Sequence, residues 1–319
     1  MQYKSKSSCL LIVLLAVFLQ ACSSPPDVFS SEGESWGIYQ MILETGSIHT
    51  LYVSENELSG LSLDPTGEKL VFSEMLGEND HVFSEIFTLD ILNGALDQLT
   101  DNEFWDIYPV WSPDGSRIAY LSWREDTLDI YTMDAAGEDQ ALLFDSGFHD
   151  ADIDWVGGKI VFTSQSKIWM MNSDGSNARA ITDPPRSGQW GNANLPFGDY
   201  DPRLRPDGSK VVFSRLIGDD SPHGNYDLFI MDLDGSNQVN LTNTGYSQGL
   251  SSWSASGDKL LYILSAKGEQ GLYDLYSIKP DGAENHLINP DNLPQDLLIH
   301  SAKYGGDDSI IYFIGQWWK

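Results

Sequence analysis

The chain has 319 residues, of which 47 are Asp or Glu and 18 are Lys or Arg, so its formal net charge is −29. Hydrophobic residues make up 41% of the sequence and aromatic residues 12%, which excludes a wholly disordered polyanion. The negative charge argues against nucleic acid as a partner. Two cysteines exclude a disulfide-rich scaffold and a cysteine-based zinc cluster.

The first residues have the features of a bacterial export signal. Lys4 and Lys6 precede an unbroken apolar run of eleven residues, 9–19, which is shorter than the roughly 20 residues that span a bilayer. The run ends in the sequence LQAC at 19–22, which resembles the lipobox of bacterial lipoproteins. The resemblance implies cleavage after residue 21, lipidation of Cys22 and anchoring in the cell envelope. An ordinary secretory signal is the alternative.

We therefore predict a lipoprotein signal peptide at 1–21, a lipidated tether at 22–35 and one folded domain at 36–319. The tether is rich in Ser, Pro and Glu, as flexible linkers are. Cleavage removes two lysines and no acidic residue, so the mature net charge becomes −31. Cys22 is then the remaining cysteine, and no intramolecular disulfide can form.

The predicted domain is one unit repeated along the chain. The clearest copy has a first half, VWSPDGSRIAYLS at 110–122, and a second half, DIYTMDAAGEDQALLFD at 129–145. An aromatic residue near the end of each first half recurs at intervals of 42 to 51 residues. The aligned aromatics are Phe72, Tyr120, Phe162, Phe213, Tyr262 and Tyr312.

Each unit contains four short runs of alternating hydrophobicity, which we name strands A to D in chain order. Turns with Gly or Asp-Gly separate A from B and C from D, as in β-hairpins. Six four-stranded units of about 47 residues predict an all-β fold, a six-bladed β-propeller. The C-terminal half-repeat, 303–319, and the N-terminal half-repeat, 38–53, would complete one blade and close the ring.

The WSPDG…IAY…IYTMD…G pattern resembles the TolB-like, WD-repeat-like family of six-bladed propellers, and it covers nearly all of 36–319. The resemblance implies the fold. It implies no single activity, because propellers include binding modules, lyases and protease caps. TolB itself carries a further α/β domain before its propeller, where this chain has the 23–35 tether.

Loop lengths single out one rim of the predicted propeller. The A–B and C–D turns are nearly constant, whereas the B–C and D–A connections on the other rim vary, and the longest includes 184–199. Long loops on a rigid scaffold often bind partners, so we predict that this rim is functional. Neutral loop drift is the alternative. Trp190 and Phe197 would stack on a sugar or on an apolar partner, or would instead plug the loop onto the rim.

Acidic residues recur at the start of strand A, at the predicted mouth of the central channel. Two columns, two residues apart, contain five aspartates together with Tyr108 and His300. The aspartates are Asp106, Asp150, Asp152, Asp199 and Asp201. Alternation in a strand would place both columns on one side, where clustered carboxylates favour a bound cation such as calcium or a cationic ligand. The alternative is that these aspartates accept hydrogen bonds from loop N–H groups.

No catalytic constellation accompanies these features. A G-x-S-x-G match at 245–249 lies in a connection between blades and not in a strand-to-helix turn. We predict a monomeric, non-enzymatic scaffold that binds an envelope protein, a peptide or a glycan on its variable rim. It would need no cofactor unless calcium binds. It would contact the membrane only through the lipid on Cys22. The alternative is a metal-dependent polysaccharide lyase that resembles the seven-bladed oligogalacturonate lyases.

Overall fold

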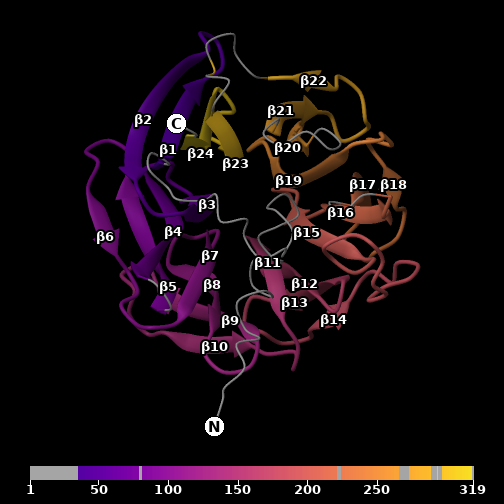
Figure 1. The fold of residues 1–319 in the computed structure, drawn as a ribbon, viewed down its shortest axis with the longest axis horizontal. Helices are drawn as coiled ribbons and strands as arrows, with labels where there is room; N and C mark the ends of the chain where they lie inside the picture. Colours follow the sequence, from indigo (N-terminus) through magenta and orange to yellow (C-terminus); the bar gives the residue numbers. More distant parts are fainter. Residues whose placement is uncertain are drawn as a thin grey trace.

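The computed structural model describes residues 35–78, 81–220, 224–265, 273–288, 293 and 297–317 (Figure 1). These residues form strands, turns and loops, and no helix occurs among them. Accordingly, no helix of this part of the chain is long and apolar enough to cross a membrane. The predicted signal peptide, lipidation site Cys22 and nearly all of the tether lie outside the described residues.

The strands form four sheets of four strands and one sheet of eight. The first sheet contains β1 (Ser35–Ile42), β2 (Ser47–Ser54), β23 (Leu297–Tyr304) and β24 (Ile310–Trp317). The eight-stranded sheet contains β3 (Leu58–Leu63), β4 (Lys69–Glu78), β5 (His81–Asp90), β6 (Leu96–Gln98), β7 (Trp105–Trp111), β8 (Arg117–Trp123), β9 (Leu128–Asp134) and β10 (Ala141–Phe144). The other sheets contain β11 (Asp150–Val156), β12 (Lys159–Ser164), β13 (Lys167–Asn172) and β14 (Arg179–Ala180); β15 (Asp199–Leu204), β16 (Lys210–Gly218), β17 (Asn225–Asp232) and β18 (Val239–Asn240); and β19 (Ser247–Trp253), β20 (Leu260–Ser265), β21 (Tyr273–Ile278) and β22 (His286–Leu287).

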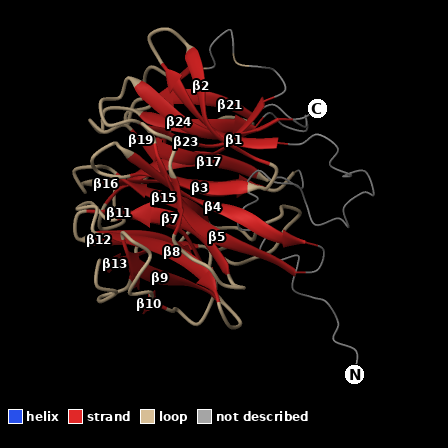
Figure 2. Ribbon diagram, turned by 90° about the vertical axis from the view of Figure 1, so that its left-hand side faces the viewer, coloured by secondary structure: helices blue, strands red, loops and turns tan. Residues whose placement is uncertain are grey.

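The sheets are arranged around a common centre (Figure 1). The eight-stranded sheet consists of two antiparallel groups, β3–β6 and β7–β10, joined by one parallel residue pair between Ser84 and Trp105. The strands that correspond to strand A lie innermost, and each contacts the next around the centre, with β23 contacting β3. These innermost strands are β3, β7, β11, β15, β19 and β23. In the side view, strands cross the thickness of the molecule, and loops gather at its two faces (Figure 2).

The two ends of the described chain pair with each other in one sheet. β1 lies antiparallel to β24 from Ser35↔Trp317 to Ile42↔Ile310, so the sheet order is β2-β1-β24-β23. The indole N–H of Trp317 also donates a hydrogen bond to the Tyr39 hydroxyl, 2.6 Å away. The predicted pairing of the N-terminal and C-terminal half-repeats is confirmed.

The repeated aromatics form the packing between successive sheets. The six aligned residues named above are all buried, with 0 to 5% of their surface exposed. In the five sequential groups each lies directly opposite the aromatic of strand C, and the ring centroids are 5.5 to 6.2 Å apart. In the sheet formed by the chain ends, Tyr39 instead faces Phe313, with centroids 5.2 Å apart. The period of the sequence therefore marks residues of the core.

Each innermost strand carries a bulge that interrupts the side-chain alternation. In β3, β7, β11, β15 and β19 the register shifts by one residue, and a residue with positive φ lies within the shift. The positive-φ residues are Gly60, Tyr108, Asp152, Asp201 and Leu250. The expectation that both acidic columns project from one side of the strand is therefore wrong, because the bulge rotates the second column relative to the first.

Gly60 offers a direct test of this packing. Its φ is +60°, and a Cβ added there would lie 2.5 Å from the Cα of Tyr108 on the neighbouring β7. We expect Gly60→Ala to lower the free energy of unfolding by about 2–4 kcal/mol, from strained backbone and overpacking together. Gly67→Ala is the control, since Gly67 has φ +77° and no atom within 4 Å of an added Cβ. Equal losses in urea denaturation would contradict the close approach of β3 and β7.

Candidate functional site

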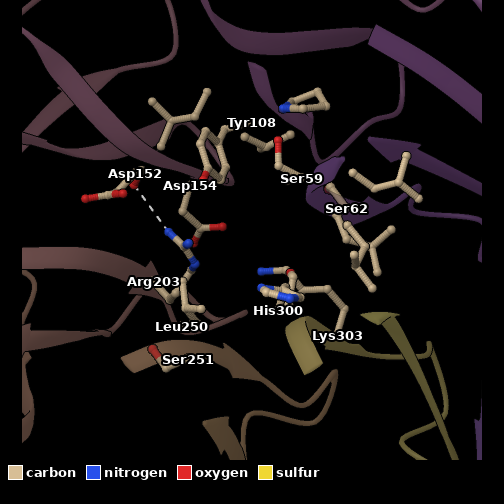
Figure 3. Close-up of a pocket in the computed structure, with 18 of the residues that line it drawn as sticks. Ser59, Ser62, Tyr108, Asp152, Asp154, Arg203, Leu250, Ser251, His300 and Lys303 are labelled. Atoms are coloured by element: carbon tan, nitrogen blue, oxygen red, sulfur yellow. Dashed lines mark hydrogen bonds between the residues drawn. The ribbon is translucent and has the colours of Figure 1, made fainter. Parts of the chain in front are cut away.

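A cavity of about 80 Å³ lies at the centre of the ring, between the innermost strands (Figure 3). Its polar lining includes charged side chains from several strands. The labelled residues are Ser59, Ser62, Tyr108, Asp152, Asp154, Arg203, Leu250, Ser251, His300 and Lys303. A second cavity of about 190 Å³ shares Ser62, Asp154, Arg203 and Lys303 with the first, so the two cavities adjoin at these four residues, and we call them together the channel.

Arg203 is the central cation of this site. Its guanidinium forms an ion pair with Asp201, and its Nη1 donates to the backbone carbonyls of Pro202, at 2.8 Å, and of Asp152, at 3.2 Å (Figure 3). The Arg203 side chain is largely buried, so its charge is compensated by the protein and not by bulk water. Arg203 thereby occupies the position in which the sequence suggested a bound cation.

The carboxylates of the channel also connect neighbouring innermost strands. Asp152 of β11 accepts a hydrogen bond from the backbone N–H of Asp201, at 3.2 Å, and Asp154 accepts one from Leu204, at 2.7 Å. Asp201 of β15 accepts one from the backbone N–H of Ser251 in β19, at 3.1 Å. These bonds satisfy backbone donors that the bulges remove from the sheet ladder, and they join three consecutive strands.

The three aspartates of the first column lie outside the cavity. Asp106 accepts hydrogen bonds from Asn102 and Ser122, and Asp150 accepts two from Ser146. Asp199 forms a bidentate ion pair with Arg215, at 2.6 and 2.8 Å. All three are buried. The alternative to a cation site, hydrogen bonds from loop N–H groups, is met at Asp150, which accepts from the backbone N–H of Ser146, whereas Asp106 accepts from side chains and Asp199 pairs with Arg215.

The structure does not gather the five predicted aspartates into one cluster. Across the described ranges, no group of three or more His, Cys, Asp and Glu side chains could hold a metal ion. The second-column carboxylates already accept backbone hydrogen bonds, and Arg203 lies beside them. The residues present therefore do not fit a calcium ion.

Tyr108 and His300 both line the cavity, as the sequence suggested. His300 has a 2.9 Å hydrogen bond between its Nε2 and Gln316 Oε1, and its ring lies 4.6 Å from that of Trp36. Burial lowers the pKa of His300 to about 4, so the ring is neutral near pH 7. Burial, with the nearby negative charges of Asp152, Glu57 and Asp201, raises the pKa of Tyr108, so its hydroxyl stays protonated.

The two predicted aromatics of the longest loop have different surroundings, and neither lines the cavity. Phe197 is 4% exposed, packs with Leu195 and Tyr226, and lies under the guanidinium of Arg186, 3.5 Å from the ring centroid. Trp190 is 63% exposed. Phe197 thus fastens the loop to the sheets, whereas Trp190 is available on the surface.

Four ionisable lining residues were not singled out from the sequence: Glu57, Asp154, Arg203 and Lys303. Asp154 and Arg203 each stand two residues after a positive-φ residue of the second column, Asp152 and Asp201. Aligning the repeats at this further position would have identified both residues from the sequence. Lys303 carried no such signal, because the shift in β23, from Ile299 to Ser301, is one residue shorter than in the other repeats, so Lys303 stands one residue beyond that column.

The ionisable groups of the cavity have altered acidities. Burial raises the pKa of Glu57 to about 7, and burial with the charge of Asp201 raises the pKa of Asp152 to about 6. Burial and the positive charge of Arg203 lower the pKa of Lys303 to about 8, although Asp154 and Asp201 act in the opposite direction. Shifts of this kind are common at binding and catalytic sites.

Two proteins of known sequence are similar to part of this chain. An uncharacterized protein of Agrobacterium fabrum is 31% identical over 194 residues, which cover 56% of this chain and 61% of that protein. A TolB homolog of Chlorobium luteolum is 28% identical over 175 residues, 53% of this chain and 36% of that one. The chain therefore spans less than two thirds of either relative. No protein-family model matches.

Solved structures share the fold at lower sequence identity. A structure from Agrobacterium tumefaciens, provisionally assigned as TolB, superposes with a TM-score of 0.70 at 15% identity, over 90% of this chain and 100% of that one. The chain therefore shares the fold of the TolB-like β-propellers. TolB of Acinetobacter baumannii gives 0.58 at 18% identity, over 78% of this chain and 61% of that one. An oligogalacturonate lyase in complex with manganese gives 0.52 at 18% identity, over 85% and 76%.

The raised pKa of Glu57 makes the stability of this propeller depend on pH. The folded chain holds the proton of Glu57 up to about pH 7, whereas the ordinary pKa is 4.5, so the carboxyl destabilises the fold increasingly as pH rises between these values. Relative to Glu57→Gln, we expect the wild-type free energy of unfolding to fall by about 2–3 kcal/mol from about pH 4 to about pH 8.

Urea denaturation across this pH range measures the difference. Glu103→Gln, at an exposed position, is the control and should leave the pH profile of the wild type unchanged. A wild-type profile parallel to that of Glu57→Gln would show that Glu57 titrates as it does in the unfolded chain.

Proposed function

We propose that the chain is a non-catalytic binding scaffold of the cell envelope, a six-bladed ring that recognises a protein or peptide partner on the rim formed by its D–A connections. The four-stranded groups and the TolB-like neighbours support the scaffold. A lipid on Cys22 would hold the ring at the membrane as a monomer. A glycan is the alternative ligand of the same rim.

The observation that carries this proposal is a set of exposed aromatic side chains on consecutive D–A connections. The connections 99–104, 145–149, 181–198 and 241–246 each lead into an innermost strand, so they share one rim. Each presents one exposed aromatic, and we call these the rim aromatics: Phe104, Phe148, Trp190 and Tyr246, which are 37 to 63% exposed. Aromatic side chains are enriched where proteins bind partners.

The negative charge of the chain favours a basic partner. A formal net charge of −29 favours association with a basic surface and disfavours acidic partners. Asp152 and Asp154 in the cavity already accept backbone hydrogen bonds, so the exposed acidic side chains of turns and loops supply most of this field. A basic protein segment that presents apolar side chains to the rim aromatics fits both properties.

Affinity capture from an envelope extract, with the chain as bait and quantitative mass spectrometry, tests this function. We expect Trp190→Ala to reduce recovery of the specific partner at least about tenfold, as for a central aromatic in an interface. A deletion of 184–199 is unsuitable, because it removes the buried Phe197 and Asp199.

Leu92→Ala is the matched control, since Leu92 is 96% exposed in the β5–β6 turn, which is a C–D turn of the other rim. An unchanged partner list with Trp190→Ala would contradict a binding role for this rim. Equal losses with Leu92→Ala would show that exposed apolar side chains act non-specifically.

A metal-dependent polysaccharide lyase is the second candidate function. The similarity to an oligogalacturonate lyase in complex with manganese and the position of His300 in the cavity favour it. The acidic side chains beside His300 are committed to Arg203 and to backbone N–H groups, which makes them poor metal ligands.

Incubation with polygalacturonate and manganese separates the two functions. We expect no unsaturated product by ultraviolet absorbance, because the described residues assemble no metal-binding group. Product that requires manganese, and that is lost in His300→Ala, would establish the lyase instead of the scaffold.

A further inference from the structure

Two ionisable side chains of the central cavity, one acidic and one basic, have no partner among the described residues. Glu57 and Lys303 both line the cavity, yet neither side chain forms a hydrogen bond or an ion pair with any described residue. The other charged side chains that line the cavity, and His300, have such partners: Asp152 and Asp154 accept from backbone N–H groups, Arg203 pairs with Asp201, and His300 contacts Gln316. Removing a charge from water without compensation is unfavourable, so a ligand that pairs with these two groups would be bound favourably.

The two unpartnered groups lie apart in the cavity. They are not within the 4.0 Å of an ion pair. Glu57 lines the first cavity only, whereas Lys303 lines both cavities and so lies where they meet. Tyr108 and Lys303 lie on opposite sides of the opening (Figure 3). The cavity therefore offers two separate unpartnered groups, an acidic one at Glu57 and a basic one at Lys303.

Further donors in the same cavity are also unsatisfied. The Nε of Arg203 and the hydroxyl of Ser251 are buried and have no hydrogen-bond partner. Ser251 is 1% exposed and lines the cavity. Buried polar groups in native proteins nearly always have a partner, so these two atoms point to acceptor oxygens that a ligand would bring.

The size of the space limits the ligand. One water molecule requires about 10–15 Å³ of such a cavity, so 80 Å³ accommodates a group of atoms comparable to a small amino acid. The adjoining 190 Å³ of the channel begins at Lys303 and leaves room for a second residue. A purely anionic ligand would leave Glu57 unpaired, and a purely cationic one would leave Lys303 unpaired.

We propose that the cavity binds a small zwitterion, an amino acid or a dipeptide, with its carboxylate at Lys303 and its ammonium group at Glu57. The Tyr108 hydroxyl accepts a hydrogen bond from this ammonium group, and Arg203 Nε and the Ser251 hydroxyl are donors for the ligand's oxygens. This site is in the channel and involves none of the rim aromatics, so it does not depend on the partner proposed above.

Isothermal titration calorimetry on the purified chain tests this site with a matched set of probes. L-Alanine and L-alanyl-L-alanine carry both charges, L-alaninamide has the ammonium group alone, and propionate has the carboxylate alone. We expect at least one zwitterion to bind at least about tenfold more tightly than either single-charge probe, because a hydrogen-bonded charge pair is lost with each. Heat from no probe, or equal affinities for all, would overturn the proposal without any variant.

Variants assign the two ends of the ligand. Lys303→Met should abolish the preference for L-alanine over L-alaninamide, and Glu57→Gln should abolish the preference for L-alanine over propionate. Lys259→Met, at an exposed lysine, should bind as the wild type does. If Lys303→Met does not fold, Lys303→Arg should retain the preference at changed affinity. Unaltered preferences in folded Lys303→Met, or the same loss in Lys259→Met, would overturn the assignment.

Trp190→Ala separates this site from the rim. The variant should bind the zwitterion with wild-type affinity even where it fails to capture a protein partner. A loss of zwitterion binding in Trp190→Ala would contradict a separate site in the channel.

Discussion

The pairing of β1 with β24 is the interaction on which the ring depends. The sheets bury apolar side chains on both faces, so each must pack between two neighbours, and a row of such sheets satisfies this condition only when it closes. β24 would otherwise present an unpaired edge and an uncovered aromatic, Phe313, which Tyr39 covers. Because the closing strands come from opposite ends of the chain, the pairing also brings together residues more than 270 positions apart.

The innermost strands convert this closed ring into a channel with its own chemistry. Their bulges expose backbone donors that the sheet ladder leaves unsatisfied, and side chains of the preceding strand accept from them. Asp152, Asp154 and Asp201 are used in this way, with Arg203 compensating their charge. Most of the charge at the centre therefore has a structural role, which explains how a buried acidic channel is stable.

The side chains that have no structural partner lie in two places, the central channel and the rim. Glu57 and Lys303 are left unpaired inside the channel, where low dielectric strengthens any interaction with a ligand. The rim aromatics are left exposed on loops held by the rigid sheets. Both arrangements suit the recognition of a ligand or a partner.

The repeat pattern by itself determined most of the fold. The aligned aromatics marked the core, the glycines marked the turns and the half-repeats marked the closure, because alternation and turn chemistry are local properties of a strand and a hairpin. The site was predicted only in part. Tyr108 and His300 line the cavity, but the five aspartates do not cluster, since one bulge residue rotates all later side chains.

Which groups are left without a partner was decided by the tertiary structure. Glu57 and Lys303 come from distant parts of the sequence and face one space only because the ring closes. Arg203 pairs with Asp201 on its own strand and donates to the backbone carbonyl of Asp152 on the preceding strand, a relation across repeats that no local pattern contains. Strand and turn positions follow from neighbouring residues, whereas charge compensation depends on every side chain that the closed ring brings within a few ångströms.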